Sequence, residues 1–141
     1  MFKQAPRRTA TLSGGNPTQE VPMSRMPAGV RSAFESELNR ARLTTDIDEM
    51  WHALERAHIL SQEWAWPHTR AHWEMLRLAI RSRDRREVVG QVLRLAFGGI
   101  ASATGRAPLG NNGRSDVGPF TPMPIPEDLM AILSSGATAA R

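Results

Sequence analysis

WHALERAHILSQEWAWPHTRAHWEML, residues 51–76, carries the clearest structural pattern in this chain. It holds all four histidines and all four tryptophans of the 141 residues. Its apolar residues recur at intervals of three and four, the spacing of one face of an α-helix, and the pattern is interrupted once, before Pro67. Because proline cannot continue a helix but starts one well, the stretch predicts two helices joined by a short turn.

Helical spacing continues on both sides of this stretch. We expect helices at residues 28–42, 46–62, 67–82 and 84–104, and a short helix at 129–133. Thr45 is the expected N-cap of the second helix. The order predicts an all-α fold of two successive antiparallel helical hairpins, a cadence typical of tetratricopeptide-like repeats.

The chain divides into four predicted parts. Residues 1–26 are rich in Pro, Gly, Ser and Thr, so we expect a disordered leader before a helical domain at 27–106. Residues 107–133 form a wrapped C-terminal segment with the short helix, and residues 134–141 a frayed tail. The Gly- and Pro-rich part of the wrap, 107–126, can hold neither helix nor regular strand. We expect Phe120, Met123 and Ile125 to lay it across the helices.

Composition excludes several classes of protein. The chain has no cysteine, which rules out disulfides and thiolate zinc sites, so a bound metal must use His, Asp, Glu or Met. The net charge is +4, and Lys3 is the only lysine. No apolar run suits a signal peptide, and Gln91 and Arg94 interrupt the longest apolar stretch too early for a membrane span. We therefore expect a cytoplasmic protein.

The histidines of the central stretch have the spacing of a metal site. His68 and His72 lie four residues apart on one face of a predicted helix, as two histidines must to share an ion. An antiparallel turn at residues 63–66 sets His58 level with them. Glu55 precedes His58 by three residues, so we predict it as a fourth ligand or as a direct partner of one. Zinc, copper, nickel and iron all suit such a site, and His52 should lie outside it.

Other interpretations of the same residues stay open. Histidines on an apolar stripe are often core residues whose ring nitrogens bond backbone carbonyls or a carboxylate such as Glu55. In that case the hairpins would form a protein interaction module or a homodimer. A metal-dependent hydrolase or oxidoreductase is the third class, but Thr69 follows His68, so the H-E-x-x-H pattern with its glutamate base is missing.

The tryptophans and arginines suggest further surfaces. Trp51, Trp66 and Trp73 are candidates to line a pocket, although four tryptophans in a hairpin more often form the core. Five arginines gather around the turn between the third and fourth helices and could contact an acidic partner: Arg77, Arg81, Arg83, Arg85 and Arg86. Acidic residues beside them favour a solvated, partly paired face, so nucleic acid is not an expected partner.

Four blocks of the sequence resemble an uncharacterised bacterial family of small helical proteins that is known only as a domain of unknown function. They are LERAHIL (54–60), WPHTRAHWEML (66–76), RDRREVVGQVLRLAFGGIASATGRAPLGN (83–111) and PFTPMPIPEDL (119–129). The resemblance covers residues 28–133 and leaves the leader outside. It implies no established activity, and it suggests a place in metal handling or resistance.

Overall fold

The structure is a computed structural model that describes residues 25–103 and 110–139, with side chains described up to residue 96 and from 110 to 136. This part of the chain contains five α-helices and no strand. The predicted leader lies outside it except for its last two residues, and so does the predicted boundary at residue 106. Met26, which we expected in the leader, is buried in the core. The helices are α1 (Ala28–Leu43), α2 (Ile47–Ser61), α3 (Ala65–Arg81), α4 (Arg85–Ala103) and α5 (Glu127–Ala139).

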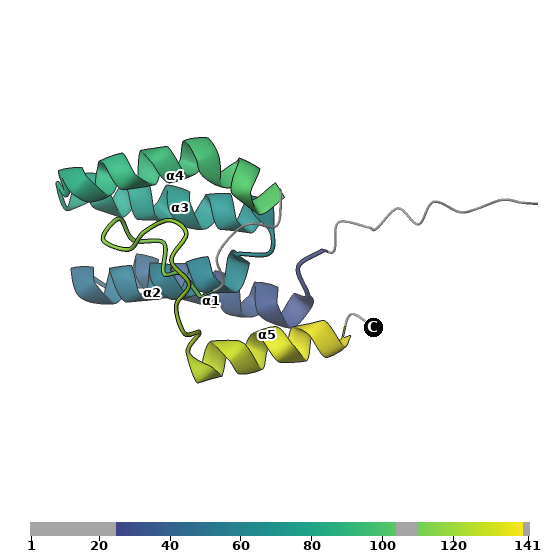
Figure 1. Ribbon diagram of the computed structural model, residues 1–141. Coiled ribbons are helices and arrows are strands. Elements are labelled where there is room, and N and C mark those ends of the chain that lie inside the picture. Colours follow the sequence, from purple (N-terminus) through teal and green to yellow (C-terminus); the bar gives the residue numbers. More distant parts are fainter. Residues whose placement is uncertain (1–24, 104–109, 140–141) are drawn as a thin grey trace, which may run out of the picture.

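The helices form two packed pairs, α1 with α2 and α3 with α4, and α2 also packs against α3. Figure 1 shows the α3–α4 pair stacked on the α1–α2 pair, with α5 on the far side of α1 and α2. Turns of three residues connect α1 to α2, α2 to α3 and α3 to α4. Because such short turns reverse the chain, each pair is an antiparallel hairpin, as the sequence predicted. The largest fully buried apolar side chains are Val30, Phe34, Leu38, Leu60, Met75 and Leu129.

Two helix starts differ from the predicted ones. Asp46, not Thr45, is the N-cap of α2, because its carboxylate accepts hydrogen bonds from the backbone N–H groups of Asp48 and Glu49 at 2.9 and 3.2 Å. Helix α3 begins at Ala65, two residues before the predicted start. Pro67 is its third residue, where a missing N–H costs no intrahelical hydrogen bond.

Helix α5 is longer than the sequence predicted. We expected it to end at Leu133, but it continues to Ala139, so residues 134–139 of the predicted frayed tail are helical, and residues 140–141 lie outside the described residues. The small residues after Leu133 carry no apolar spacing, yet the helix packs there against α1. A Cβ atom at Gly136 would lie 2.6 Å from Cγ2 of Val30, so only glycine permits this approach.

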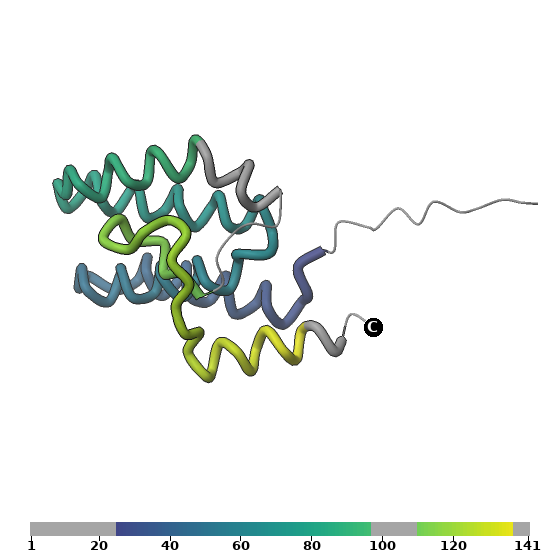
Figure 2. The backbone as a smooth tube through the Cα atoms, in the orientation of Figure 1, coloured from purple at the N-terminus to yellow at the C-terminus, as the bar shows by residue number. Residues whose placement is uncertain are grey.

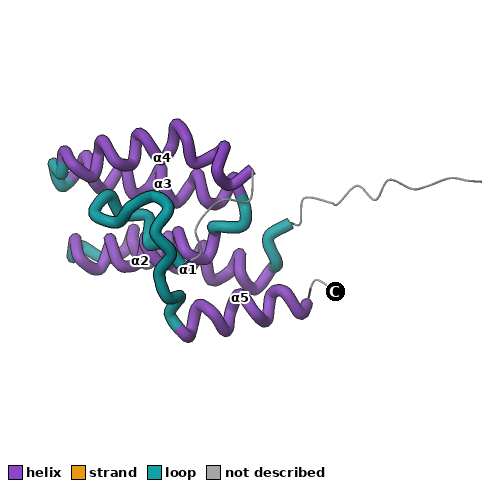
Figure 3. The backbone as a smooth tube through the Cα atoms, in the orientation of Figure 1, coloured by secondary structure: helices purple, strands orange, loops and turns teal. Residues whose placement is uncertain are grey.

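The segment from Gly110 to Pro126 starts beside the end of α2, turns past α4 and runs on to α5 (Figures 2 and 3). Ile125 packs against the core as predicted. Phe120 does not anchor the segment, because 72% of its surface is exposed. Gly110 and Gly113 adopt φ values of +77° and +83°, which side-chain-bearing residues rarely adopt, and they bend the segment between the two hairpins.

None of the described helices is long and apolar enough to cross a membrane.

Candidate metal centre

Three histidines meet between α2 and α3. His58 lies in the last turn of α2, while His68 and His72 lie one turn apart in the first half of α3. The turn between these helices folds His58 back beside the other two. All three side chains are buried, with residue exposures of 3%, 7% and 4%. The structure thus brings together the three histidines that the sequence grouped.

Their ring nitrogens surround one point. Nε2 of His58 lies 3.2 Å from Nε2 of His72 and 2.7 Å from Nε2 of His68. One ligand nitrogen from each ring lies within 4.8 Å of the other two. A tetrahedral ion with metal–nitrogen bonds of about 2.0–2.1 Å holds its ligand nitrogens about 3.3 Å apart. The separation between His58 and His72 fits this geometry, and Nε2 of His68 would have to move about 0.6 Å farther from that of His58.

The second ring nitrogen of His58 is fixed by the C-terminal segment. Its Nδ1 lies 2.9 Å from the backbone carbonyl oxygen of Asn111. A carbonyl oxygen only accepts hydrogen bonds, so Nδ1 carries the hydrogen and Nε2 keeps its lone pair. A histidine that donates through one nitrogen to a carbonyl and offers the other to a central point has the arrangement of a metal ligand.

His72 is held in the same way by a side chain of α4. Its Nδ1 lies 2.7 Å from Oε1 of Gln91, a residue with no exposed surface. The Gln91 amide nitrogen donates to Oε1 of Glu87 at 2.9 Å and to the Gly113 carbonyl at 2.8 Å. Because acceptors flank this nitrogen, the amide oxygen must be the atom that faces His72. Nδ1 of His72 therefore carries the hydrogen, and its Nε2 also offers a lone pair.

Two lone pairs thus face each other across 3.2 Å. Neutral rings with hydrogens on Nδ1 cannot form a hydrogen bond between their Nε2 atoms. A cation or a donor must satisfy both, and one N–H from His68 could be directed at only one of them along a good hydrogen-bond line. A metal ion at the centre would satisfy all three nitrogens at once.

Burial keeps the three rings neutral. It lowers the pKa of His58 well below the usual value of 6.5, and the neighbouring His72 and His68 lower it further. Burial, followed by the charge of His72, lowers the pKa of His68 to about 3. Burial also lowers the pKa of His72 to about 4, and the hydrogen bond that His72 donates to Gln91 opposes this shift. Neutral imidazole is the form that binds metals.

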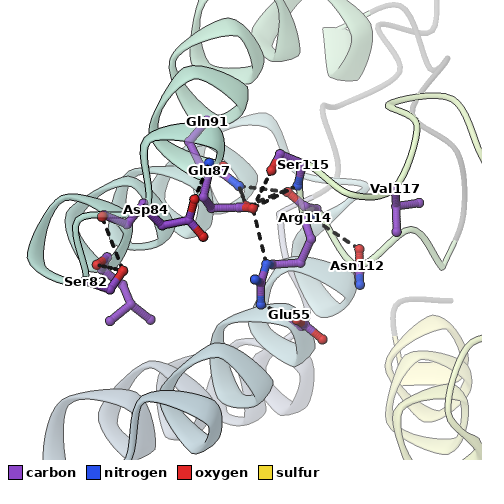
Figure 4. A network of polar contacts seen from close by, with 12 residues as sticks. Glu55, Ser82, Asp84, Glu87, Gln91, Asn112, Arg114, Ser115 and Val117 are labelled. Atoms are coloured by element: carbon purple, nitrogen blue, oxygen red, sulfur yellow. Dashed lines mark hydrogen bonds and ion pairs between the residues drawn. The ribbon is translucent and has the colours of Figure 1, made fainter.

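A buried network continues behind the rings (Figure 4). Glu87 of α4 is 2% exposed and accepts hydrogen bonds from the backbone N–H of Ser115 at 3.1 and 3.2 Å, from the Ser115 hydroxyl and from Gln91. Arg114 lies between Glu87 and Glu55, with separations of 3.5 and 3.2 Å. Its guanidinium also covers the ring of Trp51, 3.9 Å from the ring centre.

Two glycines, Gly113 and Gly90, allow the C-terminal segment to pack closely over the histidines. A Cβ atom at Gly113 would lie 2.8 Å from Cδ2 of His58, and one at Gly90 would lie 2.4 Å from Cβ of Ser115. Either addition would push the segment away from the site. Gln62 holds the segment to the end of α2, because its amide bonds the Gly110 N–H and the Asn111 carbonyl at 2.9 and 3.0 Å.

Residues 28–133 match the model of a family described as "Protein of unknown function (DUF3703)". The chain belongs to this family. The match covers most of the chain and includes all three histidines and the network behind them, so the resemblance seen in the sequence is confirmed. No curated protein and no solved structure matches the chain.

In this DUF3703 chain Glu55, which we predicted as a fourth ligand or as a direct partner of one, lies outside the converging group of ligand atoms. Its carboxylate bonds Arg114. Burial raises the pKa of Glu55, and Arg114 opposes that rise. Arg114 of the C-terminal segment pairs with the Glu55 carboxylate, which its spacing three residues before His58 had predicted to lie beside that histidine. His52 is exposed and lies outside the cluster, as predicted.

Of the three tryptophans that we predicted as candidates to line a pocket, one is buried and two are exposed. Trp51 is 6% exposed and supports Arg114, so it lies under the network. Trp66 and Trp73 are 77% and 53% exposed and do not line a pocket with the histidines. With Ile80 they repeat every seven residues along α3, on the side opposite its buried face.

The arginine cluster is exposed, and part of it borders a cleft. Arg77 and Arg81 line this cleft together with Arg42, Glu74 and Met50. Glu74 pairs with Arg42 at 2.8 Å and with Arg77 at 3.5 Å. Among the residues that the structure describes, no salt bridge reaches the other three arginines of the cluster, which are Arg83, Arg85 and Arg86.

The residues that hold the rings in place were missed from the sequence. Gln91 interrupts the apolar stripe of α4, and a polar residue at a buried helix position needs a partner, which was a usable signal. The sequence GNNG (110–113) is a turn signal, which predicts only that the chain changes direction there. Its Asn111 carbonyl and its Gly113 contact with His58 depend on tertiary packing.

Proposed function

We propose that this protein binds one transition-metal ion through His58, His68 and His72. The observation that carries the proposal is the pair of Nε2 lone pairs of His58 and His72, which face each other 3.2 Å apart while both Nδ1–H groups are used elsewhere. One N–H from His68, whose Nε2 lies 2.7 Å from Nε2 of His58, could satisfy only one of these lone pairs. Leaving the other unsatisfied in the interior is costly, and a metal ion would remove that cost.

The ligand set suits zinc, copper, nickel or iron. Imidazole nitrogens bind these ions, and calcium and magnesium prefer oxygen ligands. Three protein ligands leave one position of a tetrahedral ion for water or another small ligand. This ligand count is typical of ions that exchange or react, and structural zinc sites usually have four protein ligands. A role in metal handling, in which the ion is the cargo of the protein, agrees with this number of protein ligands.

The described residues around the site favour binding over catalysis. Many hydrolytic metal sites place a carboxylate or another base beside the open ligand position. Glu55 is engaged by Arg114, and Glu87 is engaged by Ser115, Gln91 and Arg114. Neither carboxylate belongs to the converging group of ligand atoms.

Elemental analysis of protein purified without a histidine tag tests the proposal. After removal of metal with a chelator, titration with Co²⁺ should reach one ion per chain and give the visible absorption of a four-coordinate site. The His72→Ala variant should lose this signal, and His52→Ala, which changes a histidine outside the triad, should keep it. Wild-type protein that binds less than a tenth of an equivalent of every ion would refute the metal site.

An exposed apolar surface favours a second function, the interaction module. Trp66, Trp73 and Ile80 form a stripe on the outer side of α3, and α4 exposes further apolar side chains at Val89, Val92 and Leu93. Large apolar residues gathered on one hairpin are typical of a contact surface for a protein or a second copy. Sedimentation of wild type and of the double variant Trp73→Ser, Ile80→Ser tests for a homodimer. A concentration-independent monomer for wild type would leave only a different partner for this surface.

A further inference from the structure

Glu87 is a buried carboxylate that touches none of the three rings. At 2% exposure it is the one carboxylate-bearing residue in the buried class among the described side chains. Burying an ionised carboxylate is costly unless donors surround it. Hydrogen bonds from Ser115 and Gln91 lower the pKa of Glu87 in spite of its burial, so it is ionised at neutral pH. An ionised carboxylate that is retained at this cost indicates that its charge has a role in the surrounding structure.

The first use is to orient Gln91. Oε1 of Glu87 accepts from the Gln91 amide nitrogen at 2.9 Å, and this directs the amide oxygen toward Nδ1 of His72 at 2.7 Å. If the amide turned over, an N–H would face Nδ1 of His72. The ring would then carry its hydrogen on Nε2, where an ion should bind.

Glu87 also positions the other acceptor of the same amide. The Gly113 carbonyl, which accepts from Gln91 at 2.8 Å, belongs to the C-terminal segment. Glu87 holds that segment through the backbone N–H and the hydroxyl of Ser115 and through Arg114. Both contacts that determine the orientation of Gln91 therefore depend on one carboxylate.

The second use is electrostatic. Three neutral imidazoles bring no charge to balance an ion. Arg94 of α4, which donates to the Arg114 and Val117 carbonyls at 2.7 and 2.8 Å, carries a positive charge that opposes a cation in the site. Glu87 is linked to His72 through Gln91 by hydrogen bonds of 2.9 and 2.7 Å, and its negative charge favours a cation there. Since Coulomb energy is proportional to the charge of the ion, the benefit from Glu87 is greater for a divalent ion than for a monovalent one.

We propose that Glu87 is the positioning residue of the metal site, which sets the His72 tautomer through Gln91 and favours divalent over monovalent ions. This inference rests on the proposed metal binding, but its structural part concerns the metal-free protein as well. Glu55 provides a matched control, because it pairs with the same Arg114 from the opposite side and has no contact with Gln91.

The experiment compares wild type, Glu87→Gln and Glu55→Gln with two probe ions, Zn²⁺ and Ag⁺, in competition with a chelator of known affinity. Glu87→Gln should weaken Zn²⁺ binding by about tenfold to a hundredfold, the usual effect of losing a partner behind a ligand, and Ag⁺ binding by less. Glu55→Gln should change either affinity by less than about threefold. Equal losses in the two variants, or equal losses for the two ions in Glu87→Gln, would overturn the proposal.

A second measurement separates this proposal from the metal site itself. In metal-free protein, ring ¹⁵N chemical shifts report which nitrogen of His72 carries the hydrogen. Wild type and Glu55→Gln should show it on Nδ1, and Glu87→Gln should show it on Nε2 or exchanging between the two. If no ion binds to wild type, the proposed function fails while this result still decides the role of Glu87. If Glu87→Gln does not fold, Gln91→Leu interrupts the same chain of bonds and should lose the Nδ1–H signal, and an unchanged His72 tautomer would refute the proposal.

Discussion

Nε2 of His58 and Nε2 of His72 lie 3.2 Å apart, and each ring donates its only hydrogen away from the other. His58 belongs to the hairpin of α1 and α2, and His72 to the hairpin of α3 and α4. An ion between them would tie the two hairpins together. Metal binding should therefore appear as stability of the whole domain, and not only as occupancy of a site.

Saturating metal should raise the melting temperature of the wild-type protein. An ion at a concentration one hundred times its Kd adds about 2.7 kcal/mol to the free energy of unfolding, which corresponds to a shift on the order of 10 °C for a domain of this size. Thermal melts with chelator and with zinc, copper and nickel would measure it. His52→Ala should show the full shift and His68→Ala none, and a shift that persists in His68→Ala would place the ion elsewhere.

Replacing Gly113 with alanine should damage the site without changing a ligand. The new Cβ would lie 2.8 Å from the His58 ring, and the φ of +83° is unfavourable for alanine. We expect a loss of roughly 2 kcal/mol or more in the free energy of unfolding, together with weaker metal binding.

Gly29→Ala is the matched control for that change. Gly29 lies in α1, where a Cβ would meet no atom within 4 Å. Alanine there should stabilise the protein by up to about 1 kcal/mol, since glycine is the poorer helix former. Denaturant titrations of both variants would show opposite signs. A neutral Gly113→Ala would mean that the C-terminal segment does not press on the His58 ring.

The helices and the triad could be predicted because both depend on local spacing. The interval between His68 and His72 places two rings on one side of any helix, and a short turn before Pro67 returns the chain past His58. Residues 134–139 were missed because small residues carry no periodic apolar signal, although the close approach of Gly136 to α1 holds them in a helix.

The side chains behind the triad could not be predicted for a different reason. Asn111 and Arg114 reach the site from more than fifty residues beyond His58 and Glu55, and no spacing rule connects such positions. The three-residue spacing predicted that the Glu55 carboxylate would lie beside His58. The guanidinium of Arg114, from the distant segment, pairs with that carboxylate instead. Such partners depend on how the loop packs, which local sequence patterns do not encode.

The stability of the metal-free protein should fall as the pH is lowered from about 6.5 toward 4.5. The unfolded chain takes up protons on its histidines near pH 6.5, whereas burial lowers the pKa of His68 to about 3 and that of His72 to about 4 in the folded state. In this window the unfolded state binds more protons, so the free energy of unfolding decreases by up to about 1.4 kcal/mol per pH unit for each buried ring.

Denaturant unfolding at several pH values with a chelator present would measure this slope. Glu87 and Asp128, whose pKa values are lowered by their hydrogen-bond partners, contribute only at pH values near and below their ordinary pKa values, so they affect the lower edge of the window. His68→Gln should reduce the slope, and His52→Ala should leave it unchanged. A wild-type slope near zero would show that the rings do not stay neutral in the folded protein.

Metal should also protect the C-terminal segment from trypsin at Arg114. This side chain is held by Glu55, Glu87 and the ring of Trp51, so cleavage after it requires the segment to lift from the helices. The Asn111 carbonyl accepts from His58 and the Gly113 carbonyl from Gln91, so an ion that fixes the rings also opposes that movement. Linkage is reciprocal, and an ion at one hundred times its Kd should slow cleavage at Arg114 by up to about a hundredfold if opening releases the ion.

Mass spectrometry of the fragments would give this rate beside the rate at Arg8, in the leader that the sequence predicts to be disordered. Cleavage at Arg8 should not respond to metal, so equal slowing at both arginines would indicate inhibition of the protease, and unchanged cleavage at Arg114 would show that the segment opens without disturbing the histidines.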